Sequence, residues 1–191
     1  LVGNQPNDRI SDSGFSFLDG THYALVNPSW NGNTGAVTWI DTTAPLVGVV
    51  SGANSLVGSI SGTTTTGDRV GSGGLQNFEF GKTAIFSPRW NGAMGAVSWL
   101  DIAAGSSGAV SGANSLVGST ANDQVGGSGN YQNLGGSKIA IISSNWANTA
   151  SVPNAGAVTW VDVSTGLVGA VDGSNSLVGT GVNDRVGNNG I

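Results

Sequence analysis

Hydrophobic and polar residues alternate over short stretches of this chain, and turn-forming residues separate the stretches. Around the middle of the chain the alternation and the β-branched residues predict four strands. These strands cover residues 68–71, 83–87, 96–100 and 109–117, with a possible break at Gly112. No window has the spacing of an amphipathic helix, and Asn-Gly, Gly-Ser and proline-containing joints supply turns. The pattern predicts an all-β protein.

The same pattern returns about every 60 residues, so the chain is expected to be a repeat protein. The motif Gly-Ala-Val-(Thr/Ser)-Trp ends at Trp39, Trp99 and Trp160. Leu-Val-Gly recurs at Leu1, Leu56, Leu116 and Leu177, and Asp followed by Arg or Gln recurs at Asp8, Asp68, Asp123 and Asp184. We expect repeats over residues 1–58, 59–118 and 119–179, and the start of an incomplete fourth repeat over residues 180–191.

Four short antiparallel strands per repeat are typical of one β-propeller blade, which buries its faces only against its neighbours. Ala36, Ala96 and Ala157, each preceded by glycine, would allow neighbouring sheets to approach closely. Three repeats are fewer than the four to eight blades of a closed propeller. We therefore predict blade-like tandem repeats that do not close into a ring by themselves. A β-solenoid, in which each repeat forms several coils, is the alternative.

The motifs of the middle repeat resemble those of a known family. They are Asp-Arg-Val-Gly-Ser from Asp68, a hydrophobic strand ending in Ser87-Pro88, and Gly-Ala-Val-Ser-Trp ending at Trp99. In this order they resemble the FG-GAP-type repeats of integrin-like β-propellers. They are more similar still to the Leu-Val-Gly repeats of large bacterial secreted, haemagglutinin-like proteins. The resemblance implies a propeller-type repeat, but the Asp-x-Asp-x-Asp-Gly calcium loop of many FG-GAP repeats is missing here.

Composition and charge restrict the possible partners and the compartment. Hydrophobic residues make up 38% of the chain, which is enough for folding, whereas charged residues make up only 9%. A net charge of -5 with six Lys and Arg leaves no basic stripe, so neither nucleic acid nor an anionic membrane is expected as a partner. No apolar stretch approaches the roughly 18 residues of a membrane span, and any signal sequence is expected to be removed or to lie outside this segment. The absence of cysteine fits a bacterial secreted or cell-surface protein.

The six tryptophans occupy two repeated positions. Trp39, Trp99 and Trp160 alternate with valine on a strand, and we expect them to be largely buried between sheets. The other set adjoins turns and is expected to be more exposed, which makes it the candidate contact for a glycan or protein partner. This set is Trp30, Trp90 and Trp146.

The repeated aspartates allow two interpretations. Asp8, Asp68, Asp123 and Asp184 are either ligands for a cation or polar partner, or acceptors for nearby backbone N–H groups in turns, and the second is favoured. Asp41, Asp101 and Asp162 end the tryptophan strand and are expected to cap turns. His22 occupies the position of Lys82 and Lys138, which indicates an exposed basic position rather than a general base.

No recognisable catalytic motif is present, neither a zinc-protease helix, a phosphate-binding loop, a dinucleotide fingerprint nor a nucleophile elbow. We predict a non-enzymatic, extracellular structural or adhesive module without catalytic residues, metal or cofactor; the alternative is a carbohydrate-binding propeller. Residues 1–14 and 177–190 carry the same motifs at the same spacing, so an unfinished repeat is expected to leave open strand edges. Another copy of the array would cover them, either as the continuation of a longer polypeptide or as a neighbouring subunit packed head to tail, in a ring or a filament.

Overall fold

The computed structural model describes residues 1–44 and 46–190, and almost all of its regular structure is β-strand. The first repeat contains β1 (Phe15–Phe17), β2 (His22–Asn27), β3 (Ala36–Asp41) and β4 (Ser55–Val57). The second contains β5 (Leu75–Asn77), β6 (Lys82–Ser87), β7 (Ala96–Asp101), β8 (Gly108–Ala109) and β9 (Ser115–Val117). The third contains β10 (Tyr131–Gly135), β11 (Lys138–Ser143), β12 (Ala157–Asp162), β13 (Gly169–Ala170) and β14 (Ser176–Val178).

Within residues 1–44 and 46–190, helical structure is limited to three short segments. These are the four-residue turns α1 (Trp30–Asn33) and α2 (Trp90–Ala93) and the 3-10 helix η1 (Gly127–Gly129). In α1, Asn31 and Gly32 have φ angles of 47° and 64°, so the expected Asn-Gly turn is left-handed. None of the helices described is long and apolar enough to cross a membrane.

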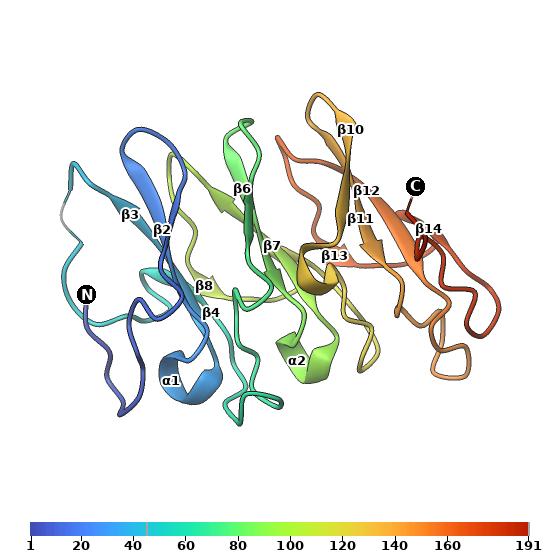
Figure 1. Ribbon diagram of the computed structural model, residues 1–191, viewed down its shortest axis with the longest axis horizontal. Helices are drawn as coiled ribbons and strands as arrows, with labels where there is room; N and C mark the ends of the chain where they lie inside the picture. The colour runs from blue at the N-terminus through green and yellow to red at the C-terminus, as the bar shows by residue number, and fades with distance from the viewer. Residues whose placement is uncertain (45, 191) are drawn as a thin grey trace.

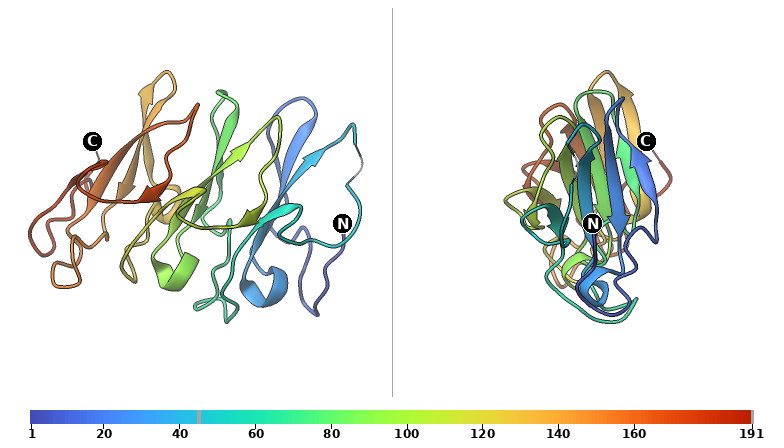
Figure 2. Two further views of the ribbon diagram at one scale, coloured as in Figure 1. Left: turned by 180° about the vertical axis from the view of Figure 1, so that it is seen from behind. Right: turned by 90° about the vertical axis from the view of Figure 1, so that its left-hand side faces the viewer.

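Each repeat forms a sheet with four antiparallel strands of its own, and this confirms the predicted fold class. The strand orders are β1-β2-β3-β4-β8, β13-β9-β7-β6-β5 and β10-β11-β12-β14. The three sheets stand in a row along the long axis, with the two termini toward opposite ends (Figure 1). Viewed along the row, the sheets lie one behind another (Figure 2). Over the described residues this row closes into neither a ring nor a solenoid.

A short strand from the following repeat extends each of the first two sheets. Strand β8 pairs in parallel with β4, with Leu56 opposite Gly108. Strand β13 pairs in the same way with β9, with Leu116 opposite Gly169. The strand predicted over residues 109–117 is therefore two strands in different sheets, and the break does include Gly112. The sheets are joined by backbone hydrogen bonds as well as by side-chain packing.

The predicted strand at residues 68–71 is wrong, because these residues form a turn. Arg69 has a φ angle of 48°, which an extended strand does not allow. The turn is held in place because the Arg69 N–H donates to the Asn33 carbonyl at 3.0 Å and the Val70 N–H donates to the Thr34 carbonyl at 3.1 Å. The first strand of this repeat begins at Leu75 instead.

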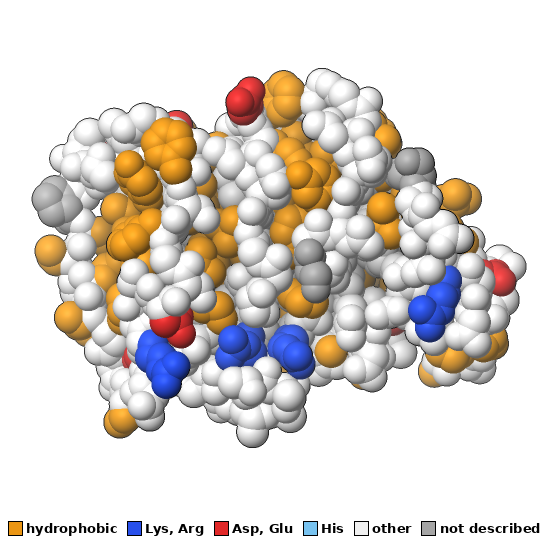
Figure 3. All heavy atoms as spheres, viewed as in Figure 1, with side chains coloured by type: hydrophobic (Ala, Val, Ile, Leu, Met, Phe, Trp, Pro, Cys, Tyr) orange, Lys and Arg blue, Asp and Glu red, His pale blue; other side chains and the backbone are white. Residues whose placement is uncertain are grey.

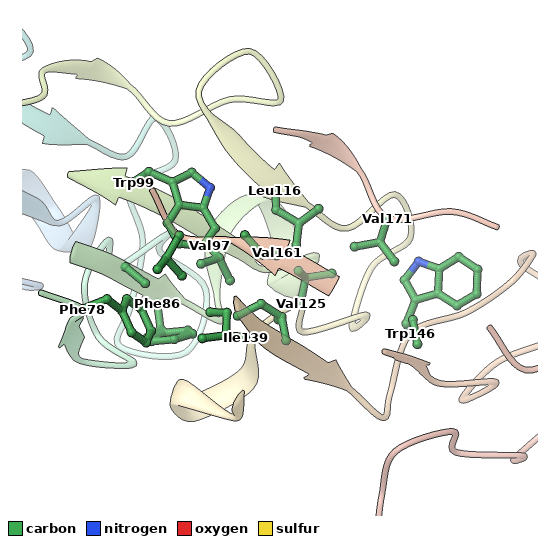
Figure 4. Packing of buried hydrophobic residues seen from close by; sticks show 14 of the residues in the cluster. Phe78, Phe86, Val97, Trp99, Leu116, Val125, Ile139, Trp146, Val161 and Val171 are labelled. Atoms are coloured by element: carbon green, nitrogen blue, oxygen red, sulfur yellow. The ribbon is translucent and has the colours of Figure 1, made fainter. Parts of the chain in front are cut away.

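The hydrophobic core lies between adjacent sheets. Between the first and second sheets, Val37 and Leu56 pack in one cluster with Ile85 and Leu100. Figure 4 shows the second such layer, in which residues of the second sheet face those of the third. Its members include Phe86, Val97, Trp99, Leu116, Ile139, Val161 and Val171. A repeat therefore buries its two faces only by packing between two neighbours.

The glycine that precedes each motif alanine allows the close approach that the sequence predicts. Ala36, Ala96 and Ala157 are completely buried. Gly35 has a φ angle of 77°, and a Cβ atom there would lie 2.2 Å from the backbone nitrogen of Val70. Any other residue would push away the connection to the next repeat.

Candidate functional site

The motif tryptophans lie on the face of each sheet that looks toward the following repeat. The Trp39 Nε1–H donates to the Ile102 carbonyl, and the Trp99 Nε1–H donates to the Leu167 carbonyl, each at 2.8 Å. Trp99 is buried as predicted, with 7% of its surface exposed, and Trp39 is half-buried. Trp160 is 55% exposed, so the prediction that it is largely buried is wrong. Its exposure follows because no repeat beyond the third is present in the described chain to cover it.

A glycine from the following repeat makes room for each covered indole. A Cβ atom on Gly105 would lie 2.9 Å from the Trp39 ring, and one on Gly166 would lie 2.7 Å from the Trp99 ring. Both glycines also have positive φ angles, of 73° and 75°. The loop backbone therefore lies directly against the aromatic ring at both junctions.

The aspartate of the Asp-(Arg/Gln) motif joins the loop at the start of its repeat to a turn later in the same repeat. One oxygen of Asp68 accepts N–H groups from Ser59 and Ile60 in its own loop, at 2.7 and 2.9 Å. The other oxygen accepts the Asn91 N–H in the turn α2 of the same repeat, at 2.8 Å. These contacts agree with the favoured turn interpretation, and they extend it, because the second oxygen reaches a turn 23 residues further along the chain.

The other repeats show the same aspartate contacts, with one difference at the last. Asp8 accepts the Asn31 N–H at 2.8 Å, and Asp123 accepts the Ala147 N–H at 2.9 Å. Burial raises the pKa of Asp123, although three backbone N–H groups oppose that shift. Asp184 accepts N–H groups from Thr180 and Gly181 in its own loop, but it is exposed.

The tryptophans expected to be exposed beside the turns lie mostly in the core. Trp30 and Trp146 are only 6% and 3% exposed, so the expectation for them is wrong, and Trp90 is half-buried. Trp30 packs with Val50 and Val57 in a core cluster of the first repeat. A buried indole has no free face for stacking on a sugar ring.

The aspartates that end the tryptophan strands cap turns, as the sequence predicts. Asp101 accepts N–H groups from Ala103 and Ala104, at 3.0 and 2.9 Å. The Ala104 N–H, helped by the Lys82 ammonium at 3.3 Å, lowers the pKa of Asp101. Lys138 pairs with Asp162 in the same way and holds the pKa of that carboxyl well below its usual range.

The basic position beside these aspartates varies between repeats. Lys138 lies over the Trp160 ring, 4.9 Å from its centre. His22 stacks on the equivalent Trp39 ring at 5.1 Å, and its Nδ1 atom lies 2.8 Å from an Asp19 carboxylate oxygen. The position therefore forms ion pairs and aromatic contacts at the sheet surface.

An open groove of about 520 Å³ lies beside Trp39, at the junction of the first and second repeats. Asp41, Leu46 and Asn54 line it from the first repeat, and Ser106 and Ser107 line it from the second. An aromatic ring beside hydroxyl, carboxylate and carboxamide groups suits a small polar ligand. No local sequence pattern predicts this groove, because its two walls come from different repeats. Among residues 1–44 and 46–190, no three acidic or histidine side chains are arranged to hold a metal ion.

Large hydrophobic side chains are exposed at the two ends of the row. At the C-terminal end, Leu177 is 70% exposed, whereas the equivalent Leu116 is fully buried. At the N-terminal end, Phe15 and Phe17 are each 61% exposed. In the space-filling view, hydrophobic side chains gather over the sheets and the basic side chains lie below them (Figure 3).

Comparison with known proteins identifies the repeat. A family model described as "Repeat of unknown function (DUF5650)" matches residues 17–72, 81–127 and 137–188. A search of curated proteins finds no match. The family description supports a repeat protein and carries no link to FG-GAP-type or haemagglutinin-like proteins. The three matches together cover well over half of the chain, and the chain therefore belongs to the DUF5650 repeat family.

Proposed function

We propose that this chain is a non-enzymatic structural or adhesive module of the bacterial cell surface that associates end to end with further repeats. The observation that carries the proposal is the difference between the inner and end faces of the row. Trp160 and Leu177 occupy positions that are covered at an inner junction, yet they are 55% and 70% exposed. Large exposed apolar side chains at one place are typical of surfaces that bind a partner.

The location and the family likeness belong to the same proposal. Low charge, abundant glycine and the absence of cysteine fit the extracellular setting that we propose. The similarity of the Asp-Arg-Val-Gly and Gly-Ala-Val-Ser-Trp motifs to FG-GAP-type and Leu-Val-Gly repeats supports a role in a larger secreted or surface protein. Strong salt-dependent binding to nucleic acid or to an anionic membrane is not expected, because only six cationic side chains are present.

Light scattering of the purified chain over a range of concentrations tests the association. We expect the average mass to rise above that of a monomer as the concentration increases, and Leu177→Asp to reduce this rise strongly. Phe80→Asp is the matched control, because Phe80 is 46% exposed but lies next to Gly81 in the turn between β5 and β6 of the middle repeat. A chain that stays monomeric at every concentration would contradict the proposed association.

Carbohydrate binding is the second candidate, and the groove beside Trp39 favours it. A sugar hydroxyl needs acceptors and donors such as Asp41, Asn54 and Ser107 beside an apolar wall. A glycan array of the chain, repeated with Ser107→Tyr to fill the groove, tests this function. Retention of a glycan by the parent chain and its loss in the variant is the expected result. Equal retention by both proteins would place binding elsewhere, and no retention by either would reject it.

A further inference from the structure

The two inner junctions define one set of contacts between successive repeats. The strand after each Trp motif pairs in parallel with the Leu-Val strand of the preceding repeat, as β8 does with β4. The loop before that strand covers the indole of the preceding repeat. The loop that leads from the preceding sheet to the following one carries the motif aspartate, which accepts an N–H from the turn of the following sheet. Both junctions contain all three contacts.

The C-terminal face carries the groups that lie on the preceding side of an inner junction. Strand β14 pairs only with β12 in its sheet, so its outer edge is open in the described chain. Trp160 is 55% exposed beside it. The Asp184 carboxylate accepts its two local N–H groups, as Asp68 does, but it has no hydrogen bond to a following turn among the described residues.

The N-terminal face carries the groups that lie on the following side of an inner junction. Residues 1–14 cover part of this face, in the place that a preceding repeat takes at an inner junction. Val2 forms a parallel bridge with Val49, and Asp8 accepts the Asn31 N–H. Leu1 and Ile10 pack against the cluster around Trp30. Leu1, Val2, Asp8 and Ile10 have equivalents in residues 177–190, namely Leu177, Val178, Asp184 and Val186.

We propose that the C-terminal face of one copy binds the N-terminal face of a second copy, displaces residues 1–14 of that second copy, and pairs Val178 with Val49 in parallel. The inference rests on the proposed end-to-end association. It adds the register of the strand pairing, and it adds that residues 1–14 compete with the second copy for the same face. The register follows from the inner junctions, where Val57 lies opposite Ala109 and Val117 lies opposite Ala170. The occupant is a second copy because the new contact continues two junctions already present within the chain.

Residues 1–14 cover the N-terminal face only in part, whereas a second copy would cover it completely. Residues 1–14 supply the loop contacts and a single bridge, but they leave Phe15 and Phe17 each 61% exposed. A second copy supplies the same loop contacts together with a whole sheet face, so additional apolar surface leaves water on both sides. Such a contact joins different surfaces of identical chains, and it forms filaments unless the rotation closes a ring.

Disulfide trapping tests the register, since the chain has no cysteine of its own. Val49→Cys and Val178→Cys are prepared as separate proteins, mixed and oxidised, and the mixed dimer is followed over time. We expect it to form at least ten-fold faster than the dimer from Val47→Cys and Val178→Cys. Val47 is 79% exposed and lies two residues away from the proposed partner. Equal rates for both pairs would overturn the register.

A reversible lock tests the displacement. In Val2→Cys/Val49→Cys, oxidation ties residue 2 to the strand that it covers, and reduction releases it. We expect the oxidised protein to remain monomeric at a concentration where the reduced protein and the parent chain associate. If the oxidised protein associates as strongly as the reduced one, displacement is wrong while the proposed end-to-end association stands. If the parent chain does not associate at all, both proposals fail.

Discussion

At the scale of single residues, the burial of a motif tryptophan depends on whether another repeat follows to cover it. The three motif tryptophans share the same local sequence, but Trp99 is 7% exposed and Trp160 is 55% exposed. The loop that covers an indole belongs to the next repeat, and Gly166 supplies it for Trp99. Equivalent residues therefore contribute unequally to stability.

Substitution of the tryptophans measures this inequality. We expect Trp99→Ala to lower the free energy of unfolding by about 3 to 5 kcal/mol, because it empties a packed site. Trp160→Ala should lower it by less than about 1 kcal/mol, because the exposed indole loses few contacts. Urea denaturation at a protein concentration low enough to keep the chain monomeric compares the two. Equal losses would contradict the difference in burial.

The turn-capping aspartates predict a loss of stability in acid. The pKa of Asp101 is lowered, first by the Ala104 N–H, and the pKa of Asp41 is lowered by Thr43. A lowered pKa in the folded state means that the contribution to stability is present above the ordinary value of 3.8 and is lost as pH falls below it. Asp123 acts in the opposite direction, because burial raises its pKa.

Denaturation midpoints between about pH 6 and about pH 2.5 test this prediction, with the acidic range chosen around the ordinary carboxyl pKa. We expect the midpoint to fall in acid, and to fall less in Asp101→Asn, which cannot gain that proton. The same slope in the variant and the parent chain would show that Asp101 does not contribute to the acid sensitivity.

At the scale of secondary-structure elements, the shortest strands connect the repeats. Strand β8 has only two residues, yet it attaches the second repeat to the sheet of the first. Immediately after it, the Val110 N–H donates to the Val57 carbonyl at 3.0 Å. The Val171 N–H donates to the Val117 carbonyl at 2.9 Å at the next junction.

Proline at this position is expected to uncouple two repeats. Val110→Pro removes the N–H group that reaches Val57, and the ring cannot take its place. We expect a loss of about 2 to 4 kcal/mol and an unfolding transition that separates into two steps. Val110→Ala is the control, because it shortens the side chain but keeps the N–H. A single sharp transition in the proline variant would show that side-chain packing alone couples the repeats.

The elements also show what a sequence of this kind allows to be predicted. The repeat length and the strands around Ala84 and Trp99 follow from alternation, because both strands are long enough for the pattern to repeat. Strand β8 has no alternation to detect, and its partner lies about 50 residues earlier in the chain. The strand predicted over residues 68–71 does not form, because Arg69 within it has a left-handed backbone that the distant Asn33 carbonyl stabilises. Contacts between repeats were the part that local patterns could not predict.

The candidate sites follow the same rule. The turn role of Asp68 was predictable, since two of its hydrogen bonds are local. Its bond to Asn91 was not, because the two residues are 23 positions apart and meet only when the repeat folds. The burial of Trp146 was missed for the same reason, since its packing partners include residues of the neighbouring sheet.

At the scale of the whole molecule, the middle repeat differs from its neighbours in having both faces covered. Ile85 and Leu100 pack in the cluster toward the first sheet, while Phe86 and Val97 pack in the cluster toward the third. The outer repeats each have one face of this kind and one that is more open. Stability should therefore vary along the row.

Hydrogen exchange of the native protein measures this variation. We expect the amide hydrogens of β6 and β7 to exchange most slowly, because their release requires both neighbours to separate. Those of β2 and β3 and of β11 and β12 should exchange faster at the same pH. Uniform exchange across the three sheets would indicate that the whole chain opens as one unit.

The offset between repeat and sheet also has a consequence for inheritance. Strands β8 and β13 each pair with the sheet of the preceding repeat. Each copied unit therefore carries one strand that pairs with the preceding sheet and one sheet edge that accepts a strand from the following unit. A gene duplication or deletion of one full period, starting at any codon, preserves this balance. The array can therefore lengthen or shorten over generations without the need to evolve a new interface. A change of half a period would instead leave a strand without its edge, and selection would remove it.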